Sequence, residues 1–125
     1  MAAWEQKLGL GMSGVVVAFM LMDGGMKLAL AQPVIDTMTA LGYPAGTFVG
    51  IGALGLLCAV LYAVPATSVL GAILLTGYLG GAIATNVRVG APLFSHILFP
   101  VYVAILAWGG LLLRRTELWA LLGLK

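Results

Sequence analysis

The stretch ATSVLGAILLTGYLGGAIATNVRVGAPLFSHILFPVYVAILAWGGLLL, residues 66–113, contains two apolar segments separated by a short polar connection. Each segment has about the 20 residues that an α-helix needs to cross the hydrocarbon core of a bilayer. The connection holds much of the hydrogen-bonding capacity of the chain, in the side chains of Asn86, Arg88, Ser95 and His96. The stretch therefore predicts two membrane-spanning helices with a candidate functional region between them.

The composition of the whole chain agrees with a membrane protein. Hydrophobic residues make up 62% of the sequence and charged residues only 8%, with a mean hydropathy of +1.14. A soluble domain has about 25% charged residues, so these apolar faces are expected to meet lipid. The formal net charge is only +2, and Arg114–Arg115 is the longest basic run, which argues against nucleic-acid binding. Cys58 is the single cysteine, which excludes a disulfide within the chain.

Two further apolar runs precede this stretch, and each of the last three runs follows a proline. Pro33 and the apolar spacing after it predict a short interfacial helix over about 33–41, which ends at Gly42. We therefore expect an all-α fold, an integral membrane four-helix bundle, with residues 1–125 forming one transmembrane domain. The predicted spans are about 9–31, 45–64, 66–86 and 93–113.

The distribution of basic residues predicts the orientation. Four spans place both termini on one side of the membrane. Four basic residues then lie on that side, namely Lys7, Arg114, Arg115 and Lys125, and two lie on the other, namely Lys27 and Arg88. The positive-inside rule therefore predicts that both termini are cytoplasmic. The polar residues near the outer ends of the spans are then expected to converge on one region.

Asp23 and Lys27 are ionisable residues within the first span. They are four residues apart, so a helix places both on one face, where they can form an ion pair. Pairing reduces the free-energy cost of placing either charge in a membrane. Two interpretations stay open, a self-neutralising pair near the headgroups or an Asp23 carboxylate that accepts hydrogen bonds from Arg88 or a ligand.

Arg88 and His96 also have alternative roles. The guanidinium of Arg88 is a rigid fork of hydrogen-bond donors, which suits the binding of anionic oxygens. Alternatively, Arg88 anchors its helix at the outer interface. His96 suits structural hydrogen bonding, ligand binding or proton transfer. Because the chain has only this histidine, we predict no metal site.

Pairs of glycines four residues apart suggest close helix packing. They are Gly46 with Gly50 and Gly77 with Gly81. Such spacing lets transmembrane helices approach closely. It predicts either a compact bundle or a homo-oligomer, and the sequence does not choose between them.

Five segments carry a family resemblance: MDGGMKL (22–28), LGYPAGTFVGIGAL (41–54), AVLYAVP (59–65), GAILLTGYLGGAIATNVRVG (71–90) and PLFSHILFPVYVAILAWGGLLLR (92–114). In these segments the chain resembles the DoxX-like family of small four-helix bacterial membrane proteins, over about residues 17–118. The resemblance implies a multi-pass protein of the bacterial inner (cytoplasmic) membrane. Some relatives are linked to quinone-associated sulfur oxidation or occur with redox partners.

The resemblance also implies a set of site residues, namely Asp23, Lys27, Tyr78, Arg88, and His96 with Pro100. The chain departs from the family pattern at three positions, where Gly55, Asn86 and Ala91 replace an acid, a histidine and an acid. The loss of three titratable groups argues against catalysis in this chain.

We therefore expect a non-catalytic or accessory module in the lipid bilayer. Its outer polar pocket would bind a lipophilic molecule with a polar head, such as a quinone, or dock a membrane redox partner. In this hypothesis Asp23 holds Arg88 in place, and the ligand is bound by Arg88, Asn86, Tyr78, Lys27 and Ser95, with further hydrogen bonds from His96. The alternative is a small membrane enzyme that uses His96 and Asp23 as an acid–base pair on an apolar substrate, with Arg88 stabilising negative charge.

Overall fold

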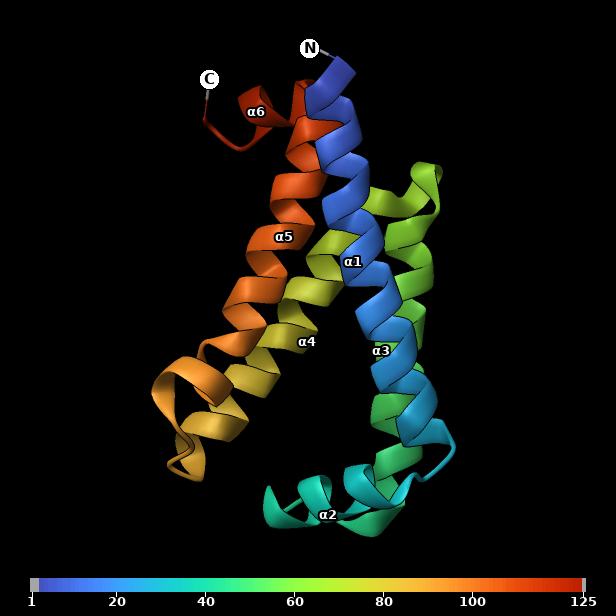
Figure 1. The fold of residues 1–125 in the computed structure, drawn as a ribbon, viewed down its shortest axis with the longest axis vertical. Coiled ribbons are helices and arrows are strands. Elements are labelled where there is room, and N and C mark those ends of the chain that lie inside the picture. The colour runs from blue at the N-terminus through green and yellow to red at the C-terminus, as the bar shows by residue number, and fades with distance from the viewer. Residues whose placement is uncertain (1–2, 125) are drawn as a thin grey trace.

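The computed structural model describes residues 3–124, and these residues contain four helices long and apolar enough to cross a membrane (Figure 1). The candidate spans are Ala3–Leu28, Ala45–Ala63, Pro65–Arg88 and Leu93–Arg114. The helices in chain order are α1 (Ala3–Leu28), α2 (Gln32–Ala40), α3 (Phe48–Ala63), α4 (Ser68–Arg88), α5 (Phe99–Arg114) and α6 (Glu117–Leu121). The all-α class is therefore confirmed, and the structure has four long apolar helices that could each span a membrane, as the sequence predicts.

The first span differs from its predicted bounds at both ends. Helix α1 starts at Ala3 because the polar residues before the apolar run contain good helix formers, such as Glu5 and Lys7. It ends at Leu28 because Leu30 adopts a left-handed conformation, with φ of 53°, which turns the chain into α2. The fourth span begins with a π-helical turn, Leu93–Ile97, before α5 continues it.

The four long helices form a ring. Helix α1 packs on α3 and α5, and α4 packs on the same two helices, so α1 and α4 face each other across the bundle. Both ends of the described chain lie at one end of the bundle, and α2 crosses the opposite end (Figure 1). The cytoplasmic position of the termini stays a prediction, and Lys125, which contributed to it, lies outside the described residues.

Helices approach most closely at glycines other than those predicted. A side chain at Gly71 would overlap the backbone of Tyr62, which shows how tightly α3 and α4 pack near their short connection. Close contacts also join Gly24 to Gly52 and Gly9 to Gly110. In contrast, no atom of the described chain lies within 4 Å of a Cβ built at the pairs Gly46/Gly50 and Gly77/Gly81. Of the two alternatives left open by the sequence, these pairs therefore do not form close contacts between helices of one described chain, and the homo-oligomer stays a prediction.

A buried hydrogen-bond network joins three helices in the half of the bundle near the termini. The Tyr62 hydroxyl on α3 donates to the Ala107 carbonyl oxygen on α5 over 2.6 Å and lies 2.7 Å from Ser13 Oγ on α1. The Arg114 guanidinium donates to Ser13 Oγ over 3.0 Å. Tyr62 is only 1% exposed and Ser13 only 7% exposed. The network therefore satisfies the buried hydroxyls of Tyr62 and Ser13, although Arg114 Nε is buried without a hydrogen-bond partner among residues 3–124, and it links α1, α3 and α5.

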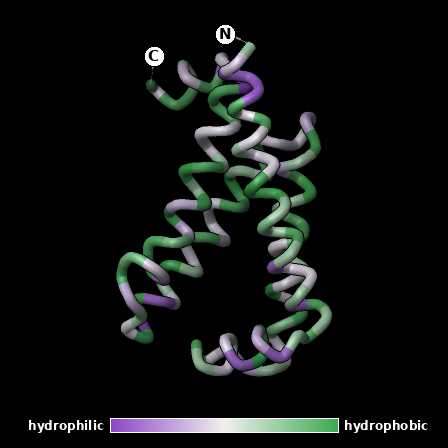
Figure 2. The backbone as a smooth tube through the Cα atoms, viewed as in Figure 1, coloured by the Kyte–Doolittle hydropathy of each residue, from purple (hydrophilic) through white to green (hydrophobic). Residues whose placement is uncertain are grey.

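Toward the α2 end, α4 and α5 diverge from α1 and α3 (Figure 1). Hydrophobic residues predominate along the long helices, whereas hydrophilic residues are found on α2, near the termini and at the connection between α4 and α5 (Figure 2). The divergence leaves room for a pocket inside the bundle at the α2 end.

Replacing Gly71 with alanine should destabilise the bundle by about 1–3 kcal/mol, because the added methyl group overpacks the α3–α4 contact. Gly80→Ala on the same helix is the matched control, since nothing lies within 4 Å of its Cβ, and it should stabilise the helix by about 0.5–1 kcal/mol. Titration with SDS in mixed micelles, followed by circular dichroism, measures both free energies of unfolding. Equal effects of the two substitutions would contradict the close α3–α4 packing.

Candidate functional site

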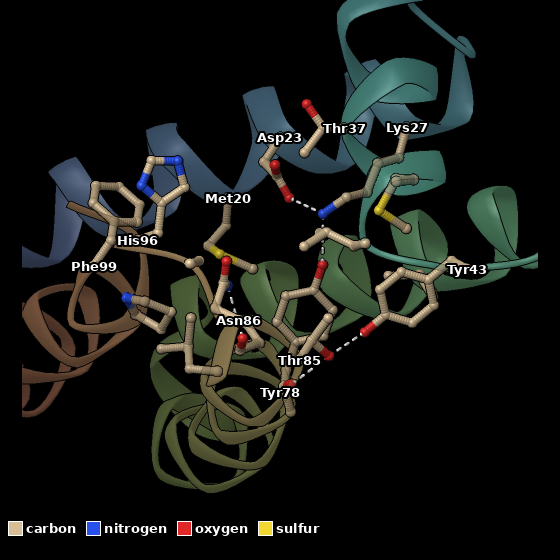
Figure 3. Close-up of a pocket in the computed structure, with 18 of the residues that line it drawn as sticks. Met20, Asp23, Lys27, Thr37, Tyr43, Tyr78, Thr85, Asn86, His96 and Phe99 are labelled. Carbon is tan, nitrogen blue, oxygen red and sulfur yellow. Dashed lines mark hydrogen bonds and ion pairs between the residues drawn. The ribbon is translucent and has the colours of Figure 1, made fainter. Parts of the chain in front are cut away.

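A pocket of about 740 Å³ lies between α1 and α4 at the α2 end of the bundle (Figure 3). Its lining comes from all five of the helices α1 to α5 and from the connections next to α2 and α5. Most of the lining is apolar. The polar or titratable side chains that line it are Asp23, Lys27, Thr37, Tyr43, Tyr78, Thr85, Asn86, Ser95 and His96.

On one side of the pocket, an ion pair is hydrogen-bonded to a tyrosine hydroxyl. Lys27 Nζ donates to the Asp23 carboxylate over 2.5 Å, and to the Tyr78 hydroxyl oxygen over 3.0 Å. The first contact follows from the i,i+4 spacing on α1, whereas Tyr78 reaches the ammonium from α4. A side chain at Gly55 would meet the Tyr78 hydroxyl at 3.1 Å, so the glycine leaves room for the phenol. The predicted Asp23–Lys27 pair is therefore present and is extended by Tyr78.

Asn86 and His96 also line the pocket, Asn86 from α4 and His96 from the π-helical turn before α5. The Asn86 amide nitrogen donates to the Ala82 carbonyl oxygen over 2.8 Å, so its Oδ1 is available as an acceptor. His96 Nδ1 lies 2.7 Å from Ser95 Oγ, and His96 Nε2 has no hydrogen-bond partner among residues 3–124. His96 and Phe99 stand on one side of the pocket, with Lys27 on the other (Figure 3). The pocket thus presents hydrogen-bonding groups on two opposing sides.

At the rim, two side chains tie the connection after α2 to the end of α4. The Tyr43 hydroxyl lies 2.6 Å from Thr85 Oγ1, and the Arg88 guanidinium donates to the Leu41 carbonyl oxygen over 2.6 Å. A cation next to the carbonyls at the C-terminal end of a helix is favourable, and Leu41 is the C-cap residue of α2. Arg88 is exposed and does not line the pocket.

In the structure, Asp23 and Arg88 do not form the contact that the hypothesis expects. The partner of Asp23 is Lys27, one turn away on the same helix, while Arg88 at the end of α4 reaches the backbone after α2. Six of the predicted site residues do share the pocket, namely Asp23, Lys27, Tyr78, Asn86, Ser95 and His96.

Several lining residues were missed by sequence reasoning. Tyr78, Ala82, Thr85 and Asn86 repeat with helical spacing on α4, so extending the face of Tyr78 would have found Thr85. Tyr43 lies in a connection without periodicity, and no comparable signal marks it. No sequence signal marks Thr37, Met20 or Phe99, and only their position around the cavity distinguishes them.

The charges within the pocket cancel. Asp23 and Lys27 are the only carboxylate and ammonium among its lining residues, and they are paired with each other. Among residues 3–124, no three side chains of His, Cys, Asp or Glu are grouped so that they could hold a metal ion. The chemistry that the site offers is therefore hydrogen bonding within a largely apolar cavity.

The fold and the pocket define a multi-pass membrane protein with four candidate spans. The family model of the DoxX-like family matches residues 11–110. The chain therefore belongs to the DoxX-like family, and the resemblance seen in the sequence is confirmed. Comparisons with curated proteins and with solved structures found no match.

A double-mutant cycle tests the ion pair. Lys27→Met should lower the free energy of unfolding by about 1–3 kcal/mol, because it leaves the partly buried Asp23 carboxylate without its cation. In an Asp23→Asn background, Lys27→Met should lower the free energy of unfolding by at least about 1 kcal/mol less than it does in the parent protein, because residue 23 then carries no negative charge. The same SDS titration measures all four proteins.

Gln32→Ala is the control for this cycle. It removes an exposed hydrogen bond to Asp36, also between residues four apart, and should change stability by less than about 0.5 kcal/mol. Additive effects of the Lys27 and Asp23 substitutions would show that the pair contributes nothing to the folded state.

Proposed function

We propose that this protein is a binding or accessory module of the membrane whose pocket takes a lipophilic molecule with a small, uncharged, oxygen-bearing head, such as a quinone. The observation that supports this proposal is the combination of apolar walls with hydrogen-bonding groups on two opposing sides of one cavity. Ligand pockets of about 300–1,000 Å³ are usually lined in this way, with few polar groups that set orientation.

The hydrogen-bonding groups suit a head with oxygens at both ends. Because the Tyr78 hydroxyl oxygen accepts from Lys27, its own hydrogen is available to a ligand carbonyl. His96 Nε2 offers a donor or an acceptor from the opposite side, according to its tautomer. A flat ring with two carbonyl oxygens matches such an arrangement.

The charge balance favours an uncharged head. A carboxylate or phosphate in the pocket would have to compete with Asp23 for Lys27, and no second ammonium or guanidinium lines the cavity. Burying a charge without a partner is costly, so a fatty acid or phospholipid headgroup suits the site less well than a neutral one.

The enzymatic alternative rests on the fact that His96 and Asp23 line the same pocket. Asp23 would have to exchange its bond with Lys27 for one with the substrate, which makes binding the simpler function of the observed arrangement. Docking of a membrane redox partner is compatible with binding, since a quinone can carry electrons between proteins. We place the protein in the bacterial inner membrane with both termini cytoplasmic.

Native mass spectrometry of the gently purified protein tests the proposal directly. We expect a molecule bound in a one-to-one ratio that is identified after release as a quinone or another neutral lipophile. Release of bulk phospholipid only, together with no measurable binding of added decylubiquinone, would contradict the proposed function.

The role of Tyr78 gives a sharper prediction. Tyr78→Phe should weaken decylubiquinone binding up to about tenfold, because the ligand loses one hydrogen bond while the ring is kept. Tyr102→Phe is the matched control, since its hydroxyl donates to the Phe94 carbonyl oxygen and it does not line the pocket. Titration calorimetry in detergent measures both dissociation constants, and equal values for the two variants would remove Tyr78 from the site.

A further inference from the structure

The pocket reaches the surface of the bundle within the membrane-spanning part of α3 and α4. Leu54, Gly77 and Gly81 all line the pocket, and all three are exposed, Leu54 to 50%. No atom of the described chain lies within 4 Å of a Cβ built at either glycine. These positions lie inside spans, so the surface next to them faces lipid. An opening toward the bilayer therefore lies between α3 and α4.

On the α1–α5 side of the pocket, an aromatic contact joins the two helices. The rings of Phe19 and Phe99 meet edge to face, with centroids 5.2 Å apart, and both residues line the pocket. Aromatic pairs in this geometry pack favourably. The opening beside Gly77 and Gly81 has no such cover.

Helix α2 covers the end of the pocket that points out of the membrane. Met38 on α2 is only 4% exposed and lines the pocket, while Gln32, Asp36 and Thr39 are exposed polar residues. Figure 2 shows hydrophilic residues on α2 at this end of the bundle. An amphipathic helix of this kind lies at the membrane interface with its apolar face inward.

Two hydrogen bonds connect the segment 31–43 to α4 in the described part of the chain. They are the Tyr43–Thr85 and Arg88–Leu41 contacts, and Thr85 and Arg88 stand three residues apart on one face of α4. The segment itself turns at residues with positive φ, Leu30 at 53° and Gly42 at 87°. We call the two hydrogen bonds the clasp.

From this arrangement we infer that the pocket is loaded from the bilayer through the opening between α3 and α4, and that α2, held by the clasp, closes the pocket to water. Arg88 is then a positioning residue that acts through α2 and not a ligand contact. The inference deepens the proposed function and rests on it, because a lipophilic ligand is dissolved in the bilayer and water would compete for the polar groups of the site.

The experiment measures access to the pocket without any ligand. A reporter cysteine replaces Ala82, which lines the pocket, in a Cys58→Ala background, and the protein is placed in nanodiscs so that both faces of the bilayer are open to reagents. Two thiol reagents are compared, the neutral, lipophilic N-phenylmaleimide and a permanently charged trimethylammonium thiosulfonate. Each labelling rate is normalised to the rate of the same reagent with free cysteine.

We expect the lipophilic reagent to label the reporter at least about tenfold faster than the charged one after normalisation, since the opening between α3 and α4 faces the bilayer and a permanently charged reagent does not enter hydrocarbon. Gly81→Leu should slow the lipophilic reagent several-fold, with Gly77→Leu as a second test of the same opening. Gly80→Leu is the matched control, because Gly80 is also exposed on α4 with nothing within 4 Å but does not line the pocket.

The clasp is tested with the charged reagent. Arg88→Met together with Tyr43→Phe removes both hydrogen bonds and should raise its labelling rate about tenfold, whereas Tyr102→Phe should not change it. Similar normalised rates for the two reagents in the parent protein would overturn closure to water. If neither Gly77→Leu nor Gly81→Leu changes the labelling rate of the lipophilic reagent, the opening between α3 and α4 is overturned. If the clasp variant does not change the labelling rate of the charged reagent, the role of the clasp is overturned.

These results are separable from the proposed function. If the protein binds no quinone or other lipophile but the labelling pattern holds, the access path stands and the proposed ligand class fails. If binding is found but the pattern fails, the ligand reaches the same pocket by another path.

Discussion

The structure depends on the absence of water in the hydrocarbon core. Each polar group within a span needs a partner inside the protein, because an unsatisfied group there costs several kcal/mol. Lys27 meets this requirement with Asp23 on its own helix and Tyr78 on another. Ser13 and Tyr62 meet it through each other and through the Ala107 carbonyl. Both sets of bonds link helices that apolar packing alone would leave free to rotate.

Polar groups within the spans have partners in both halves of the bundle, but their surroundings differ. Near the termini, close packing around Gly71 and Gly110 leaves the polar network of Tyr62 buried. Near α2 the helices diverge, and the group of Lys27 and Tyr78 faces a cavity. The first network therefore serves the fold, whereas the second is available to a ligand.

Different interactions hold α3 and α4 at the two ends of the bundle. A short connection at Pro65 holds α3 and α4 together near the termini. At the opposite end, α2 crosses the end of the bundle, and the connection after it is joined to α4 by the Tyr43–Thr85 and Arg88–Leu41 hydrogen bonds. The pocket therefore lies at the end of the bundle where no short connection holds α3 and α4 together, and α2 lies across that end.

The sequence by itself determined the membrane class, the four spans and the Asp23–Lys27 pair, because hydropathy, proline positions and i,i+4 spacing are local properties. Six of the predicted site residues share one pocket. Only the tertiary structure decided that Tyr78 joins Lys27, that Arg88 holds Leu41, and which glycines bring helices together. Such contacts depend on the rotation of each helix about its axis. Helices that are apolar on nearly all sides leave that rotation unspecified in the sequence.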